Sequence, residues 1–216
     1  MSRDADAEYD RSIFLNCPFD DEYQPLFRAV MFAVLTCGFR ARCALEADDG
    51  GEVRIAKIHR LIRDSRHGIH DISRTELDEP TGLPRFNMPF ELGLFLGARE
   101  FGGAKQQQKR ALILDVDRYR YQKFCSDISG QDIKAHEGSP QKAIRAVRNW
   151  LITALAGNEL LLSTATIVHR FEEFTADLPD VCEKLLLDID DLQFVELRAL
   201  AEEWVLLTPA PVPAQP

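Results

Sequence analysis

The chain alternates short apolar runs with longer stretches in which apolar residues recur every three or four positions. Short runs bounded by turn residues are typical of buried strands, whereas the longer periodic stretches are typical of helices that pack one face. The run Arg110–Val116 (RALILDV) shows the strand pattern most clearly. On this basis we expect five strands, over Ser12–Asn16, Phe39–Leu45, Gly68–Ile72, Arg110–Val116 and Gln131–Ala135.

The helical stretches differ in how much of their surface is apolar. The first, Tyr23–Cys37, is apolar nearly all round, so we expect it to be deeply packed. Pro25 suits its first turn, and Gly38 suits its end. The second, Glu52–Ser65, is amphipathic, with basic residues along one side. We expect further helices over Met88–Phe101, Pro140–Leu155, Thr164–Leu178 and Leu192–Leu207.

Five strands that alternate with helices predict an α/β fold. Parallel strands need a crossover connection, which is usually a helix, so the sheet should be parallel and covered on both faces. By analogy we expect the flavodoxin-like strand order 2-1-3-4-5. We expect residues 1–10 to be a disordered N-terminus and residues 11–156 to form the α/β domain. Residues 157–207 should form a helical C-terminal appendage, and residues 208–216 a disordered Pro-rich tail.

The charge is unevenly spread along the chain. The 26 Lys and Arg against 35 Asp and Glu give a net charge of −9, which argues against long nucleic acid as a partner. The segment Arg11–Trp150 holds 22 basic and 19 acidic residues, a net charge of +3, and the flanks carry −12. The α/β domain can therefore accept a small phosphate-bearing substrate, and the acidic C-terminal helices could dock a protein partner.

The sequence also predicts the compartment. It has five cysteines, an odd number, without a Cys-x-x-Cys pair, which is typical of a reduced, cytoplasmic protein. Residues 1–10 are polar and acidic, unlike a signal peptide. The longest strongly apolar stretch, Val30–Cys37, is too short to cross a bilayer, so we expect no membrane partner.

Polar residues follow the first and third predicted strands. In an open parallel sheet, ligands bind beyond the carboxyl ends of the strands at the point where the strand order reverses. With the order 2-1-3-4-5 that point lies between these two strands. Asn16–Asp20 follows the first strand, and His70–Arg74 follows the third. The same residue types also favour turns and caps, so both interpretations stay open for each residue.

Glu91 is a carboxylate in an apolar helical stretch. Pro89 fits a first helical position, which would put Glu91 in the first turn, where it could balance the helix dipole. Alternatively, a carboxylate with such apolar neighbours must have a partner or face a cleft. Gly93 and Gly97 would allow this helix to approach the sheet closely.

These segments together resemble a known superfamily. Asn-x-Pro-Phe at 16–19, Asp-x-Ser at 71–73 and Phe-Glu-Leu-Gly at 90–93 are similar to motifs of the nucleoside 2-deoxyribosyltransferase-like proteins. TIR (Toll/interleukin-1 receptor) domains are structurally related to them, and the resemblance spans Ser12–Leu155. It implies that Glu91 is the catalytic carboxylate in cleavage of an N-glycosidic bond.

The resemblance implies a substrate class and leaves its identity open. The deoxyribosyltransferases use this glutamate as a nucleophile on the sugar, and many TIR enzymes use it to split nicotinamide from NAD. The segment Arg85–Pro89 stands where the former have a Gly-Thr-type element, and the Trp-Cys pair of the latter is missing. The resemblance also implies a homo-oligomer and a role in prokaryotic antiphage defence.

Other candidate residues follow from their positions beside Glu91. Asp71 could bind a ribose hydroxyl or help to protonate the departing base, and Asn16 could orient the sugar. Phe19 or Tyr23 could stack on the base, with a surface loop position as the alternative for Tyr23.

The remaining candidates would bind the rest of the substrate. Arg74 and Arg85 on the loop after the third strand could hold phosphates. Asp20, Ser73 and Asn87 belong to the same loops and complete the set of expected substrate-binding residues.

Rival sites are less well supported by the pattern. Cys17 and His70 could form a nucleophile–base pair, but Pro18 interrupts the helix N-terminus that would activate the thiol. His67 and His70 should face opposite sides of their strand, so we expect no metal site and no cofactor. Gly102–Lys105 lacks the spacing of a phosphate loop and should be a turn. A non-catalytic TIR-like module that binds nucleotides or self-associates remains the alternative function.

Overall fold

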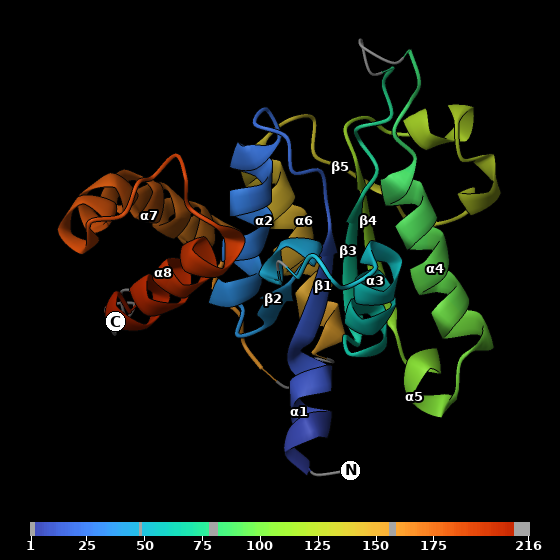
Figure 1. The fold of residues 1–216 in the computed structure, drawn as a ribbon, viewed down its shortest axis with the longest axis horizontal. Coiled ribbons are helices and arrows are strands. Elements are labelled where there is room, and N and C mark those ends of the chain that lie inside the picture. Colours follow the sequence, from blue (N-terminus) through green and yellow to red (C-terminus); the bar gives the residue numbers. More distant parts are fainter. Residues whose placement is uncertain (1–2, 48, 78–81, 156–158, 210–216) are drawn as a thin grey trace, which may run out of the picture.

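The computed structural model describes residues 3–47, 49–77, 82–155 and 159–209 (Figure 1). Five parallel strands form one sheet in the order β2-β1-β3-β4-β5, which confirms the predicted fold class and strand order. The strands are β1 (Ser12–Asn16), β2 (Arg40–Arg42), β3 (His67–Asp71), β4 (Arg110–Asp115) and β5 (Lys134–Ala135).

The two edge strands are shorter than the sequence predicts. β2 ends at Arg42 because the chain then turns into the short 3-10 helix η1 (Ala44–Glu46), where the Arg42 guanidinium binds the Glu46 carboxylate at 2.6 Å. β5 pairs with β4 only at Leu114 and Asp115. The amino-terminal part of β4 therefore has an outer edge that no described strand covers.

Helices cover both faces of the sheet (Figure 1). On one face, α2 (Gln24–Thr36) and α6 (Pro140–Ala154) pack over a large core; on the other, α3 (Arg54–Arg63) and α4 (Asn87–Phe101) enclose a smaller one. The short α5 (Ala104–Gln107) begins where only a turn was expected. Two further 3-10 helices, η2 (Arg120–Lys123) and η3 (Ser126–Ile128), follow β4.

The apolar surface of α2 is explained by two C-terminal helices that cover its outer side. These are α7 (Thr164–Leu185) and α8 (Phe194–Leu207), and they share one core with α2 and the sheet. The ring of Phe32 on α2 stacks on Phe174 of α7 at 5.2 Å between centroids. α7 continues past Pro179, beyond the predicted end at Leu178, because Cys182 in its last turns is buried in this core.

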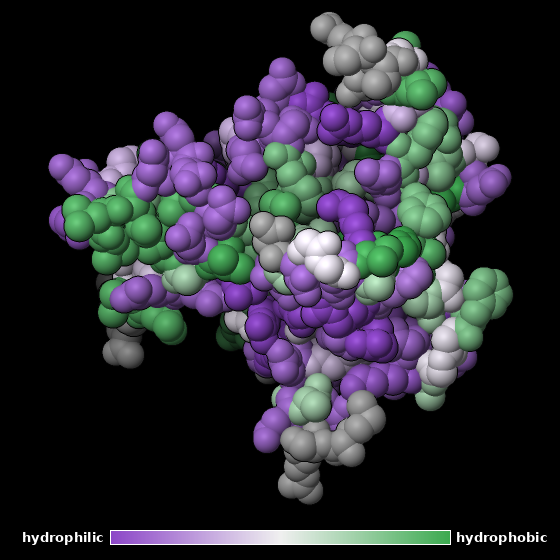
Figure 2. Space-filling view, in the orientation of Figure 1, coloured by the Kyte–Doolittle hydropathy of each residue, from purple (hydrophilic) through white to green (hydrophobic). Residues whose placement is uncertain are grey.

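The surface in the same orientation is mainly hydrophilic, with apolar side chains gathered over α7 and along α4 (Figure 2). Among the described residues, none of the helices combines the length and the apolar character that crossing a lipid bilayer requires.

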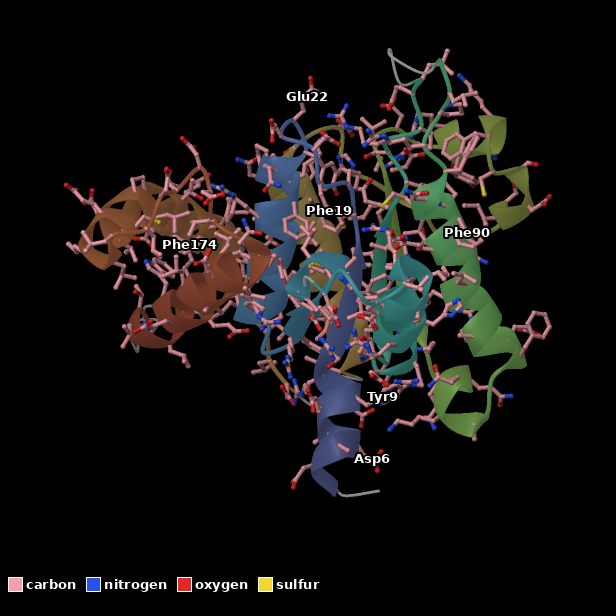
Figure 3. All side chains as sticks on the ribbon, in the orientation of Figure 1. Asp6, Tyr9, Phe19, Glu22, Phe90 and Phe174 are labelled. Carbon is pink, nitrogen blue, oxygen red and sulfur yellow. The ribbon has the colours of Figure 1, made fainter. Side chains whose placement is uncertain are left out.

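The N-terminus corrects a prediction. Residues 3–11 form a helix, α1 (Arg3–Arg11), although the sequence predicts disorder over residues 1–10. Tertiary contacts hold this helix: Tyr9 is buried and donates its hydroxyl hydrogen to the Lys105 carbonyl oxygen at 2.8 Å, and Asp6 lies 2.7 Å from the Lys105 ammonium (Figure 3). At the other end, the predicted disordered tail from residue 210 onward lies outside the described residues.

The glycines of α4 do not bring that helix onto the sheet. Gly93 and Gly97 lie on the outer side of α4, where an added Cβ would meet either nothing or only Phe101 of the same helix. The close approach is made from the strand instead. A Cβ on Gly68 of β3 would lie 2.8 Å from the Phe95 ring, so a side chain there would push α4 away.

Candidate functional site

The polar residues at the carboxyl edge of the sheet divide into two groups on opposite faces. Asn16 of β1 lies beside His70 of β3 in the strand register, and both side chains point toward α3 and α4. Because successive strand residues alternate between faces, Cys17 and Asp71 point toward α2 and α6, where each is fully buried. The sequence-predicted candidates therefore do not all meet at one point.

Asn16 ties the two central strands to the start of α4. Its amide nitrogen lies 3.0 Å from His70 Nδ1 and donates to the Met88 carbonyl oxygen at 2.9 Å. His70 Nδ1 therefore accepts, and its proton lies on Nε2. Burial lowers the pKa of His70 to about 3, so the ring is neutral. The carbonyl oxygen of Asn16 is buried and has no hydrogen-bond partner among the described residues.

Glu91 lies on the same face of the sheet as Asn16. The Phe95 ring contacts the His70 ring, with 4.8 Å between centroids. Glu91 precedes Phe95 by four residues, so it stands on the same side of α4, about 6 Å closer to the helix N-terminus. This position is beyond the carboxyl end of β3, at the point where the strand order reverses between β1 and β3.

Glu91 is a mostly buried residue whose carboxylate has no neutralising partner among the described residues. Its residue is 6% exposed, and it forms no hydrogen bond or ion pair with the rest of the described chain. Burial raises the pKa of Glu91 to about 7, while the positive charge of Arg54 at the start of α3 acts in the opposite direction. Glu91 thus changes its charge near neutral pH.

The helix-dipole interpretation of Glu91 is not what the structure shows. α4 begins at Asn87, two residues before Pro89, so Glu91 is the fifth helical residue and lies outside the first turn. Its carboxylate bonds none of the free backbone N–H groups among the described residues of the helix start. Among the described residues, Glu91 therefore has neither a capping role nor a partner.

Asp71 has the opposite environment. One of its oxygens, Oδ2, accepts a hydrogen bond from the Tyr23 hydroxyl at 2.5 Å and lies 3.1 Å from His136 Nε2. The other accepts from the backbone N–H of Ser73 at 2.9 Å. Burial alone would raise the pKa of Asp71, but the hydrogen bonds from His136, Ser73 and Tyr23 lower it below its usual value. Asp71 is therefore ionised and fully engaged.

This network joins three loops of the carboxyl edge. His136 Nδ1 accepts from the backbone N–H of Gly138 at 3.0 Å, which leaves the proton on Nε2, facing Asp71. Tyr23 belongs to the loop after β1, Ser73 to the loop after β3, and His136 follows β5 directly. Asp71 holds these loops together, which makes it a positioning residue for the edge of the sheet.

Cys17 is a poor nucleophile in this structure. Burial, reinforced by the negative charge of Asp71, raises the pKa of the Cys17 thiol well above its usual value. Its side chain also lies on the opposite face of the sheet from His70. The two residues therefore do not form the nucleophile–base pair considered as a rival site.

Several predicted substrate-binding residues lie at the surface. Arg74 binds the carboxylates of Asp20 at 2.7 Å and Glu22 at 2.6 Å, so its charge is already neutralised (Figure 3). The half-buried Phe19 contacts the Phe27 ring, with centroids 5.5 Å apart. The structure thus joins Asn16 to the start of the helix that carries Glu91, through the Met88 carbonyl oxygen. It groups Asp71 with Tyr23 and Ser73, and Asp20 with Arg74; Phe19, Arg85 and Asn87 belong to none of these groups.

Arg120 is a positioning residue that sequence reasoning missed. It donates to the carbonyl oxygens of Ile72 and Ser73 at 2.9 and 2.7 Å, and to the Thr75 hydroxyl at 2.9 Å. The buried carboxylate of Asp115 holds it in place at 2.8 Å. Arg120 therefore fixes the start of the loop between β3 and α4. Nothing in the local sequence around η2 indicates this contact.

Two other missed residues had a signal in the chain. His136 stands directly after a strand, so the rule that selected Asn16 and Asp71 would also have selected it. Arg54 is the first residue of α3 and follows a glycine-rich loop. A cation at this helix start lies at the carboxyl edge of the sheet, where Asn16 and Asp71 also lie. Neither was selected because only the ends of the first and third strands were considered.

Within the described ranges, no group of His, Cys, Asp and Glu side chains could hold a metal ion. His67 packs against Phe39 and Trp150 on the α6 face, whereas His70 packs against Phe95 on the α4 face. This confirms that the two histidines diverge.

A comparison of the chain with protein-family models and with curated protein sequences finds no match.

Proposed function

We propose that this protein cleaves the N-glycosidic bond of a nucleoside or nucleotide, with Glu91 as the catalytic carboxylate. The observation that carries the proposal is the state of Glu91. It is buried and unpaired among the described residues, its pKa is raised to about 7, and it lies where the strand order reverses. An unpaired buried carboxylate costs stability, and such costs concentrate at functional sites.

The chemistry needs a group of this kind. As the bond between the sugar and the base breaks, its electron pair leaves with the base nitrogen and positive charge develops on the anomeric carbon. The ionised Glu91 stabilises this charge or forms a bond to the carbon, as carboxylates do in glycosidases. Water or a second acceptor then takes the sugar, and the base leaves with a proton.

Neighbouring residues have proposed roles that fit their contacts. Asn16 is buried and acts by donating to the Met88 carbonyl oxygen, which positions the start of the helix that carries Glu91. Arg54 is exposed and keeps part of the Glu91 population ionised at neutral pH. Asp71 and Arg120 act at a distance by holding the loops after β1 and β3, with Asp71 buried away from substrate. The net positive charge of the segment 11–150 favours a phosphate-bearing substrate in the cytoplasm.

Glu91→Gln tests the proposal. The purified chain is incubated with nucleosides, nucleoside 5′-monophosphates and NAD, and the released base is measured by chromatography. We expect Glu91→Gln to lower the rate by about 100-fold or more, because the amide can neither carry the charge nor attack the carbon. In the parent chain the rate should rise from pH 6 to pH 8 as Glu91 ionises.

The matched control is Glu100→Gln, which makes the same change on an exposed residue of the same helix and should leave the rate unaltered. An unchanged rate in Glu91→Gln would remove Glu91 from the mechanism. Binding of a substrate without any cleavage would instead support a non-catalytic nucleotide-binding module.

A further inference from the structure

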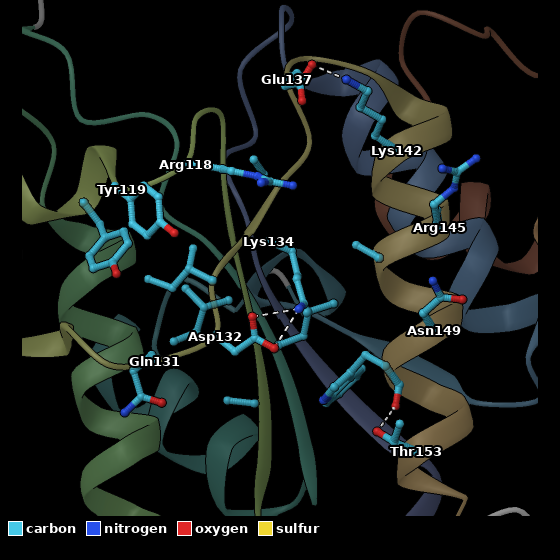
Figure 4. A pocket seen from close by; sticks show the side chains of 18 residues that line it. Arg118, Tyr119, Gln131, Asp132, Lys134, Glu137, Lys142, Arg145, Asn149 and Thr153 are labelled. Carbon is cyan, nitrogen blue, oxygen red and sulfur yellow. Dashed lines mark hydrogen bonds and ion pairs between the residues drawn. The ribbon is translucent and has the colours of Figure 1, made fainter.

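A groove of about 980 Å³ lies at the β4–β5 edge of the sheet, away from Glu91 (Figure 4). One wall is a single side of α6, along which Lys142, Arg145, Asn149 and Thr153 follow one another. Thr153 follows Lys142 by eleven positions along the helix, so the wall is about 16 Å long. The opposite wall is built from Arg118, Tyr119 and Tyr121 after β4, and from residues 131–135 with Glu137.

The floor of this groove is the uncovered outer edge of β4. The Arg110 N–H donates to Arg66, and the Leu114 carbonyl accepts from Ile72, so the even-numbered residues of β4 bond toward β3. Backbone groups of a parallel strand alternate in direction, and the Asp115 carbonyl indeed accepts from His136 on the outer side. The backbone groups of Ala111 and the N–H of Ile113 therefore face the groove.

Positive charge is in excess along the walls. Lys134 is paired with Asp132 at 2.6 Å, and Lys142 is paired with Glu137. Arg118 and Arg145 form no ion pair with any residue in the described part of the chain. In Figure 4, Arg118 reaches from one wall toward the α6 wall that carries Arg145. The groove thus presents two unneutralised guanidinium groups above an open strand edge.

We propose that this groove binds an extended acidic peptide of a partner protein, which adds to the sheet as a strand beside β4. Main-chain hydrogen bonds to Ala111 and Ile113 provide affinity, as in other cases of strand addition, and acidic side chains pair with Arg118 and Arg145. A wall of about 16 Å matches about five extended residues at 3.3 Å each. A small anion would pair with the arginines and leave the strand edge open.

The test uses the full chain and a fluorescein-labelled heptapeptide of alternating glutamate and valine, with binding followed by fluorescence anisotropy. We expect the double variant Arg118→Gln, Arg145→Gln to weaken binding by about tenfold or more, because both charge-assisted contacts are lost. A double variant of surface arginines outside the groove, Arg40→Gln with Arg63→Gln, makes the same charge change and should bind like the parent.

Two further measurements separate strand addition from simple charge attraction. A peptide of the same sequence that is N-methylated at alternate residues keeps its charge but loses one edge of N–H groups, and it should bind more weakly. Amide hydrogen exchange of Ala111 and Ile113 should slow when the plain peptide binds.

The outcomes decide the proposal. It is overturned if the plain peptide does not bind at millimolar concentration, or if it binds equally well to the Arg118→Gln, Arg145→Gln variant. It is also overturned if the N-methylated peptide binds equally well while inorganic phosphate or ADP displaces it, since the groove would then be a site for small anions.

Discussion

Asp71 and Glu91 are two buried carboxylates at the same edge of the sheet, on opposite faces, and their pKa values shift in opposite directions. Asp71 is fully buried but accepts hydrogen bonds at both oxygens, and its pKa is lowered. Glu91 is 6% exposed and has no such partner among the described residues, and burial raises its pKa to about 7. Partners, more than burial, decide which carboxylate stays ionised.

The two carboxylates differ in what they contribute to the protein. A carboxylate with satisfied oxygens holds its surroundings in place, whereas one without partners is held in an unfavourable state that a substrate can relieve. On the α2 and α6 face the network around Asp71 is structural. On the α3 and α4 face, Glu91 and the carbonyl oxygen of Asn16 have no hydrogen-bond partner among the described residues.

Of the substitutions at these two carboxylates and their partners, Asp71→Ala should have the largest effect on the free energy of unfolding. The change leaves Tyr23, Ser73 N–H and His136 buried without their acceptor, so we expect a loss of about 3 kcal/mol in the free energy of unfolding. Urea denaturation at pH 7 measures it. Since the folded-state pKa of Asp71 is lowered, its contribution is present above pH 4 and should fade as the pH drops below that value. A loss below about 1 kcal/mol would contradict the structural role.

Glu91→Gln should change the free energy of unfolding in the opposite direction and make the protein more stable. The folded-state pKa is raised from 4.5 to about 7, so the folded state loses stability as the pH rises from 4.5 to about 7, and the loss is complete above that. The neutral amide avoids this loss. We expect the variant to be about 1–3 kcal/mol more stable than the parent at pH 8 and nearly equal to it at pH 5.

Urea denaturation at the two pH values measures this difference, with Glu100→Gln as the exposed control on α4. A stability difference that is the same at pH 5 and pH 8 would show that Glu91 does not titrate between them. A variant that gains stability and loses base release would have the signature of a catalytic group.

The smallest effect is expected for Tyr23→Phe, which removes one donor to Asp71 and keeps the ring. We expect a loss of about 1 kcal/mol, because Asp71 still accepts from Ser73 and faces His136. Thermal unfolding shows whether the variant is less stable than the parent. The α4 face should be unaffected, so base release by Tyr23→Phe should match that of the parent; a large drop would show that the two faces are coupled.

The elements that the sequence predicts well are those whose signal is local. β1 and β4 are buried, nearly continuous apolar runs, and their observed bounds agree with the prediction to within one residue. β2 and β5 were predicted too long, because the length of an edge strand depends on its single neighbour. The helix α1 was missed, because Tyr9 and Asp6 are held by Lys105, which lies 96 and 99 residues away in the chain.

The candidate site was predicted in part. The position of Asn16 and Glu91 at the reversal point of the sheet follows from strand order, a rule that needs only the order of elements. The separation of Asp71 from them follows from the register between β1 and β3, which places Asn16 beside His70. Register is set by pairing across the sheet and is not visible in either strand alone.

The sequence by itself determined the α/β architecture and the presence of a carboxylate in the helix after β3, because hydrophobic periodicity is a local property. The strand order was expected by analogy, and the strand pairing of the structure confirms it. Only the tertiary structure decided which carboxylate has partners. The Tyr23 hydroxyl comes from 48 residues away, and His136 comes from the far edge of the sheet. A pKa depends on what the fold brings within a few ångströms of the group, and so does the contrast between Asp71 and Glu91.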